Sequence, residues 1–474
     1  MVFTSYAFWG FYAVFCVFYA ANLKFVRSVR LQNVIVLVGS YFAYAWWDWR
    51  FLALIVAITI VTFVAARLIE SGRYRKLALW AATAYALGAL FVFKYFDFFV
   101  GEADQLLRAV GLETSIHGLS LILPVGISFY TFQSLTYVVD VYRRSSPASR
   151  NLLDYAAYIA FFPQLVAGPI ERAAHLLTQF HGLRAPSGPD IIRGLELILT
   201  GLVMKIVVAD NLAPTVDHIF STPIENQSGG VLALGLLYFT FQIYGDFCGY
   251  STIAVGTARV LGFDLMQNFN TPYFARSPRE FWQRWHISLS TFFRDYVYLP
   301  IGGSRVGTGR IAANLLATFA LSGLWHGANW TFLLWGIYHG TLVAGQHLAR
   351  RLPVLSWAFP GRTLLDIAFT FLLMLIGWSL FRSPDVGHSL AYLERVVADL
   401  CFPEDFKFVS IYIPLCLGMD LAWRGNTNLR LDVGLFGAKQ LQPYISLAYY
   451  SALFWLLVFS IQKNEGVTFI YFQF

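Results

Sequence analysis

The sequence predicts an all-α, polytopic membrane protein that forms a single domain over residues 1–474. Three observations support this fold class. Hydrophobic residues make up 57% of the chain and charged residues only 13%, whereas a soluble domain carries roughly 25% charged residues. The mean hydropathy is +0.58. Apolar stretches approaching the length that crosses a bilayer, about 20 residues, recur along the whole chain.

The predicted spanning helices follow these apolar stretches, although several are short or interrupted by Gly or Pro. They are 4–21, 31–47, 50–68, 77–99, 119–139, 194–210, 230–256, 311–326, 329–348, 364–381, 407–423 and 442–461. The first is expected to be a retained span with its N-terminus outside, because Lys24, Arg27 and Arg30 follow the apolar run, whereas a signal peptide carries its basic residues before it. The run 154–169 is a candidate re-entrant segment, since it ends in Pro163, Gly168 and Pro169.

The charges of the connecting loops agree with this topology, because Lys and Arg concentrate in cytoplasmic loops. Basic loops are expected at 67–76, 143–150 and 259–310, and they alternate with acidic loops at 102–113, 210–225 and 385–405. The pI near 9.1 is therefore attributed to membrane orientation, and no nucleic-acid binding is predicted. The four cysteines, Cys16, Cys248, Cys401 and Cys416, show no metal-ligand spacing, so no metal site is predicted.

Residues 273–310 are the least apolar part of the middle of the chain and are predicted to form a cytoplasmic or interfacial helical segment. Ser277 is suited to the N-cap and Pro278 to the first helical position, and Glu280 completes a capping box. Trp282, His286, Leu289 and Phe293 then recur at helical spacing on one face. The helix is expected to end before Pro300, Gly302 and Gly303.

His326 is the strongest candidate for chemistry. It lies in the segment 322–330, between two apolar runs, and an ionisable side chain at membrane depth is a functional-site hypothesis by default. Burial disfavours the imidazolium form, so His326 is expected to be neutral and able to accept a proton. Gly323 and Gly327 would let a substrate or a backbone approach closely. The alternative is a structural histidine with a partner on a neighbouring span.

Two further candidates carry a structural alternative of equal weight. His286, in the segment 284–288, is a structural residue of an interfacial helix or, if 273–298 folds beneath the core, a second imidazole in the same cavity as His326. Asp246, in the segment 244–251, must be paired if it is buried. We expect it either to orient a histidine or to pair with an arginine such as Arg284 or Arg294, or else to form a helix-packing ion pair.

The motifs of the chain resemble those of the membrane-bound O-acyltransferase superfamily, and within it the bacterial alginate O-acetyltransferase branch. Residues 284–290, followed by 293–296 and 300–303, resemble the central signature of that branch. Residues 322–330, followed by 335–340, resemble its catalytic signature. The segments 163–173, 246–251 and 469–474 also match. Cys248 and Thr252 depart from the pattern, which has Ser and an acidic residue there in many members.

The resemblance implies an arched ring of tilted helices that thins the membrane around a central tunnel. It implies that His326 is the catalytic histidine and His286 the second signature residue. It also implies a bacterial inner-membrane enzyme without a bound cofactor, to which acetyl-CoA or another thioester brings an acetyl group from the cytosol. Extracytoplasmic acetylation proteins would receive the acetyl group and modify an exported polysaccharide, which we expect to be alginate.

On this hypothesis His326 removes the proton of the attacking hydroxyl while the thioester carbonyl is attacked, and His286 positions the donor or the acceptor. The arginines of residues 276–310 are expected to contact the phosphates of the donor. The residues expected to bind substrate are Asp246, Tyr250, Trp325, Asn329, Trp282, Arg284 and Arg294.

Two alternatives remain open. The same fold would also suit D-alanyl transfer to teichoic acid or acetylation of peptidoglycan or cellulose. A protein of another class, a proton-coupled transporter, would use the histidines as a proton relay. Such transporters are expected to contain internal repeats, and the sequence has no recognisable repeat.

Overall fold

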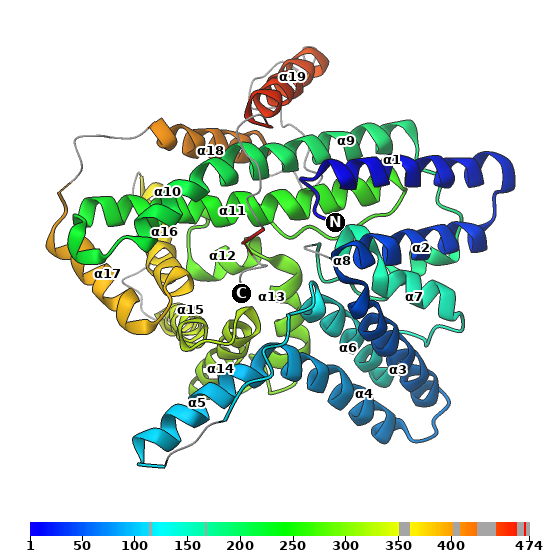
Figure 1. Ribbon diagram of the computed structural model, residues 1–474, viewed down its shortest axis with the longest axis horizontal. Coiled ribbons are helices and arrows are strands. Elements are labelled where there is room, and N and C mark those ends of the chain that lie inside the picture. Colours follow the sequence, from blue (N-terminus) through cyan, green and yellow to red (C-terminus); the bar gives the residue numbers. More distant parts are fainter. Residues whose placement is uncertain are drawn as a thin grey trace. The chain divides into compact units, whose positions relative to one another are not determined.

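The computed structural model describes residues 1–112, 116–165, 168–349, 361–401, 408–423, 442–461 and 469–470. Within these ranges every regular element is a helix (Figure 1), which confirms the all-α class. The chain divides into two compact units. Unit 1 comprises residues 1–198 and 253–266, and unit 2 comprises residues 199–252 and 267–474. The single domain over 1–474 and the arched ring with a tunnel stay predictions.

Unit 1 is built from the N-terminal helices. They are α1 (Tyr6–Ala21), α2 (Val29–Asp48), α3 (Leu52–Glu70), α4 (Arg75–Leu90), α5 (Phe96–Ala109), α6 (Ile127–Arg143), α7 (Leu152–Ala160), α8 (Phe162–Leu165) and most of α9 (Gly188–Leu202). The predicted span 119–139 was wrong at its start. Gly126 has a left-handed backbone (φ 76°) and lies so close to the carbonyl oxygen of Leu165 that a Cβ would overlap it. Helix α6 therefore begins only at Ile127.

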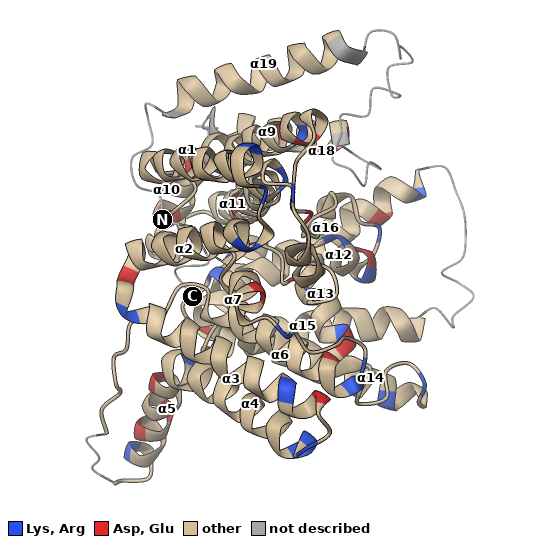
Figure 2. Ribbon diagram, turned by 90° about the vertical axis from the view of Figure 1, so that its right-hand side faces the viewer, with Lys and Arg blue, Asp and Glu red and all other residues tan. Residues whose placement is uncertain are grey.

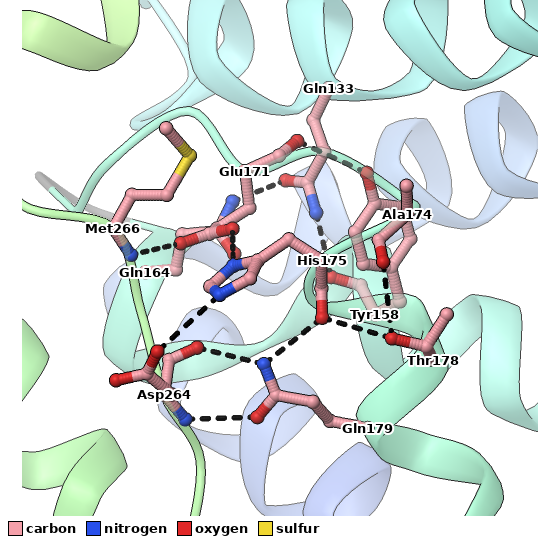
Figure 3. Close-up of polar contacts among 10 residues, drawn as sticks. All are labelled: Gln133, Tyr158, Gln164, Glu171, Ala174, His175, Thr178, Gln179, Asp264 and Met266. Atoms are coloured by element: carbon pink, nitrogen blue, oxygen red, sulfur yellow. Dashed lines mark hydrogen bonds and ion pairs between the residues drawn. The ribbon is translucent and has the colours of Figure 1, made fainter. Parts of the chain in front are cut away.

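Part of the motif 163–173 forms a polar cluster that ties two segments of unit 1 together (Figure 3). The fully buried carboxylate of Glu171 accepts hydrogen bonds from the Met266 N–H and, at 2.8 Å, from Nδ1 of His175. Nε2 of His175 lies 3.4 Å from the carboxylate of Asp264. The carboxylates of Asp264 and Glu171 together raise the pKa of His175 to about 10. A charged imidazole thus clamps the loop 171–175 to residues 264–266.

Unit 2 contains the remaining helices. They are α10 (Asp210–Ser221), α11 (Gly229–Val260, whose last turns belong to unit 1), α12 (Pro278–Arg284), α13 (Ile287–Phe293), α14 (Thr308–His326), α15 (Trp330–Ala349), α16 (Arg362–Arg382), α17 (Val386–Ala398), α18 (Tyr412–Trp423) and α19 (Gln442–Ile461). Short π-helices, η5 (Val203–Ala209) and η8 (Arg294–Tyr298), precede α10 and follow α13.

Helices α14 and α15 pack closely against each other because glycines line their contact. A Cβ on Gly323 would overlap the carbonyl oxygen of Phe332, and a Cβ on Gly336 would overlap that of Phe319. Gly327 faces the ring of Phe332 in the same way. The close approach that these glycines allow is therefore between the two helices and their loop, and it fixes the position of His326 at the end of α14.

The predicted helix within 273–310 begins as expected but is broken in the middle. The Ser277 hydroxyl accepts the Glu280 N–H at 3.2 Å, and the Glu280 carboxylate accepts the Arg276 N–H at 2.9 Å. A single helix through Phe293 was wrong. Helix α12 ends at Arg284, and α13 starts at Ile287 after His286, which has a left-handed backbone with φ 43°.

The composition of the helices is that of a multi-pass membrane protein. Among the described residues, five helical stretches are long and apolar enough to cross a bilayer: Tyr6–Val26, Val29–Glu70, Arg75–Ala109, Gly229–Val260 and Arg362–Arg382. Figure 2 shows that most of the charged residues lie at helix ends and in the connecting loops. Lipid therefore serves as the solvent for much of the surface.

Candidate active site

The fold brings His286 and His326 together within unit 2. Their ring centroids are 6.4 Å apart, although forty residues separate them in the chain. His326 is the last residue of α14, and His286 is the second of the two residues, Trp285 and His286, at the break between α12 and α13. Both side chains are buried, with exposed fractions of 3% and 1%. The two imidazoles thus form one pair inside the protein.

Aromatic rings surround this pair of imidazoles. The ring centroid of His326 lies 4.9 Å from that of Trp325 and 5.0 Å from that of Trp335. His286 lies 4.6 Å from Phe247 and 5.8 Å from Trp325. Burial among these rings lowers the pKa of His286 to about 3, and neither of its ring nitrogens has a hydrogen-bond partner among the described residues. His286 is therefore an uncharged imidazole at neutral pH.

A third buried imidazole, His339 of α15, belongs to the same aromatic cluster. Its ring is 4.8 Å from Trp335, the indole that also contacts His326. It is 5.1 Å from Trp282 of α12. Trp282 in turn lies 5.5 Å from Trp335. Helices α12, α14 and α15 therefore place these rings in one connected cluster.

Asp246 lies in a buried ion cluster of unit 2, next in sequence to Phe247, whose ring contacts His286. The carboxylate is 2.6 Å from Nζ of Lys205, which is also 2.6 Å from the carboxylate of Asp210. The Ile470 N–H donates to the second oxygen of Asp246, and the ring of Tyr250 lies 4.2 Å from that of Phe469. Asp246 and Tyr250 thus contact the C-terminal segment. The matched residues 471–474 lie outside the described part of the chain.

Lys205 was missed by the sequence analysis. It lies in η5, inside the apolar run 203–209, and its side chain is 1% exposed. One signal was present, since a lone Lys within an apolar segment requires a carboxylate partner. The expected arginine partners of Asp246 were wrong. Arg284 pairs with Glu280 at 2.7 Å, and Arg294 pairs with Asp295 at 2.7 Å.

Asn329 acts as a cap in the described structure. Its side-chain oxygen accepts the Thr331 N–H at the start of α15, and its amide donates to the carbonyl of Pro384, both at 3.0 Å. These bonds hold the loop that follows His326 and connect it to the segment after α16. A substrate-binding role for Asn329 stays a prediction.

A cavity of about 430 Å³ lies among α12, α13, η8, α14 and α15. Its lining includes Arg279, Trp282, Arg294, Ser322 and His347. His286 and His326 are not among the lining residues, but their close neighbours Ile287 and Ser322 are. Trp282 forms part of the cavity wall, and its ring also contacts the rings of Trp335 and His339. The cavity therefore reaches the edge of the aromatic cluster that holds the imidazoles.

Comparison with known proteins gives the family. The sequence model of the membrane-bound O-acyltransferase family matches residues 41–381. A probable alginate O-acetylase of Azotobacter vinelandii is 40% identical over 77% of this chain and 72% of its own length. A peptidoglycan O-acetyltransferase of Helicobacter pylori is 32% identical over 79% of this chain and 75% of its own. A teichoic acid D-alanyltransferase of Bacillus subtilis is 27% identical over 57% and 71%. The chain belongs to the membrane-bound O-acyltransferase family and is an O-acyltransferase.

Proposed function

We propose that this enzyme moves acetyl groups from a cytosolic thioester, acetyl-CoA, across the bacterial inner membrane for O-acetylation of an exported polysaccharide, alginate. The observation that carries the proposal is the pair of neighbouring buried imidazoles, 6.4 Å apart. Their close neighbours Ile287 and Ser322 line a cavity whose wall includes two arginines, Arg279 and Arg294. The identity of 40% to a probable alginate O-acetylase supports the choice of acceptor.

The reaction requires one group that accepts and returns a proton. His326 takes the proton of the acceptor hydroxyl as its oxygen attacks the thioester carbonyl. A new C–O bond forms, the C–S bond breaks, and the proton passes from His326 to the leaving thiolate. His286 remains uncharged and orients the donor or the acceptor beside His326. Because burial in the aromatic cluster lowers the pKa of His286 to about 3, this ring need not first lose a proton at neutral pH.

The cavity supplies a binding site for the donor. Arg279 is exposed and has no carboxylate partner among the described residues, so its charge is available to a phosphate of the donor. Arg294 adds a second guanidinium on the same wall. Ser322 and Ile287 mark the inner end, one helical turn from His326 and one residue from His286. The thioester would lie at this inner end, close to the imidazoles.

The immediate acceptor is the hydroxyl of an extracytoplasmic acetylation protein or of the polymer itself. Two alternatives within the family follow from the more distant relatives, which are named for acetylation of peptidoglycan and D-alanylation of teichoic acid. The same imidazoles would serve each reaction, so the products decide among them. Acetate on alginate, acetate on peptidoglycan and D-alanine esters should be measured in the same cells.

The decisive experiment compares His326→Ala and His286→Ala at matched membrane abundance, with polymer-bound acetate as the readout. Loss of a general base should lower acetate transfer by about 10²- to 10⁴-fold in His326→Ala. His181→Ala is the control, because His181 is an exposed histidine of unit 1. Wild-type acetate levels in His326→Ala would remove the catalytic assignment. Loss of acetate in His181→Ala as well would show that the readout reports only general damage.

A further inference from the structure

The buried amide of Asn268 lies against the backbone that carries His286. Its exposed fraction is 2%. The main-chain carbonyl of Asn268 accepts the Ile287 N–H at 2.9 Å. The side-chain oxygen Oδ1 accepts the Ser288 hydroxyl at 2.6 Å and the Ser288 N–H at 3.4 Å. Its Nδ2 donates to the Ser251 hydroxyl of α11 at 2.9 Å. Asn268 therefore bonds both to the first two residues after His286 and to a neighbouring helix.

We propose that Asn268 is a positioning residue that holds the His286 imidazole beside His326. This inference rests on the proposed function, in which His286 orients a substrate. It assigns to Asn268 a role in acetyl transfer that is exerted entirely through His286.

The backbone of His286 needs such support. Its φ of 43° lies in the left-handed region, which is unfavourable for a residue with a Cβ. The apolar pattern of residues 278–293 instead favours one continuous helix, in which His286 would have ordinary helical angles. The main-chain bond from Ile287 holds the start of α13 against residue 268, and the side-chain oxygen of Asn268 adds the two bonds from Ser288. Asn268 thereby stabilises the break at which His286 lies.

The ring of His286 has no hydrogen bond of its own to fix its orientation. Neither nitrogen has a partner among the described residues, so the ring position depends on packing and on the backbone. It packs against Phe247 of α11 at 4.6 Å. Ser251, the acceptor of the Asn268 amide, lies four residues later on α11, on the same face of the helix. Asn268 and Phe247 together fix His286 to one side of α11.

The test uses the full-length protein in lipid nanodiscs with isotope-labelled histidine. The imidazole signal of His286 is identified by its absence in His286→Ala. In Asn268→Ala this signal should shift, and acetyl transfer per folded molecule should fall by about ten- to a hundred-fold, as expected when a reacting group is misplaced by about 1 Å. An unshifted His286 signal, or unchanged transfer in Asn268→Ala together with loss of transfer in His286→Ala, would overturn the inference.

Asn33→Ala is the matched control. Asn33 is a buried amide of unit 1 that donates to Asp154 and to the Phe180 carbonyl and accepts from Arg184. Its loss should lower stability without moving the His286 signal. If Asn33→Ala moves that signal equally, the effect of Asn268→Ala is general loosening and the inference fails.

A milder variant keeps the test informative if Asn268→Ala does not fold. Ser251→Ala removes only the bond from Asn268 to α11, so it should shift the His286 signal in the same direction and lower transfer less. No shift in Ser251→Ala would contradict the proposal. Wild-type acetyl transfer in His286→Ala would refute the proposed role of His286, and this failure is distinguishable because the spectroscopic shift in Asn268→Ala would persist.

Discussion

Replacing Lys205 with Met should lower the free energy of unfolding of unit 2 by more than the loss of any surface charge would. Lys205 Nζ lies 2.6 Å from Asp210 and 2.6 Å from Asp246, and the three side chains are 1%, 7% and 3% exposed. Met keeps a similar length and volume but removes the charge. The substitution therefore isolates the electrostatic contribution of Lys205 to the free energy of unfolding.

The expected loss in the free energy of unfolding follows from the buried carboxylates that remain without a cation after the substitution. Removing one partner of a buried ion pair costs about 3–5 kcal/mol, because the other charge stays buried without compensation. Here two carboxylates remain, so we expect about 5 kcal/mol, the upper end of that range. The triple variant Lys205→Met, Asp210→Asn, Asp246→Asn should recover most of this loss, since a neutral replacement of a buried ion cluster often costs little.

Unfolding in mixed micelles of a mild detergent and dodecyl sulfate, followed by circular dichroism, measures this difference. Lys76→Met is the control, because Lys76 is exposed at the start of α4 and a surface change of this kind usually stays within about 0.5 kcal/mol. A loss below about 1 kcal/mol in Lys205→Met, against the expectation for a broken buried pair, would refute the ion cluster. A triple variant as unstable as Lys205→Met would refute the electrostatic explanation.

Three further predictions concern packing, pH and the donor. Gly336→Ala should cost about 1–3 kcal/mol in the same unfolding assay, because its Cβ would overlap the Phe319 carbonyl, whereas Gly345→Ala, with open space around it, should cost nothing; equal effects would contradict the packing. His175 has a raised pKa of about 10, so its stabilising effect should be full below about pH 6.5 and fade as the pH rises through 10; a His175→Ala penalty in thermal stability that is equal at pH 6 and pH 10 would contradict the clamp. Arg279→Gln should raise the KM for acetyl-CoA about tenfold, as for a lost contact of about 1.4 kcal/mol, with kcat unchanged; an unchanged KM would remove Arg279 from the donor site.

The helices could be predicted from the sequence because each one is determined by the residues within its own stretch. An apolar stretch of about 20 residues satisfies its backbone internally in lipid only as a helix. The spans 311–326 and 329–348 therefore lie within a few residues of α14 and α15. The cap at Ser277 was predictable for the same reason, since its hydroxyl bonds a backbone N–H only three residues away.

The predictions that were wrong concern features that depend on contacts between residues distant in sequence. The break at His286 is stabilised by Asn268, eighteen positions earlier, so helical periodicity within 278–293 could not reveal it. The partner of Asp246 is Lys205, on another helical segment. A single sequence indicates that a buried carboxylate needs a cation, but it does not say which of several cations folds beside it. The pairing of the two imidazoles depended on this same tertiary folding.

Buried polar side chains of this protein differ in whether their hydrogen bonds are made. Asn33 in unit 1 uses both its donor and its acceptor. In the aromatic cluster of unit 2, by contrast, ring nitrogens of His286, Trp282, Trp335 and His339 have no partner among the described residues. Each unmade bond costs about 1–3 kcal/mol, and stability alone does not explain keeping several in one cluster. The carbonyl and hydroxyl oxygens of an acyl-transfer reaction are groups that can accept and donate these bonds. We propose that substrate binding offsets the cost of folding this cluster, because the same nitrogens that weaken the free enzyme would then bond the substrate.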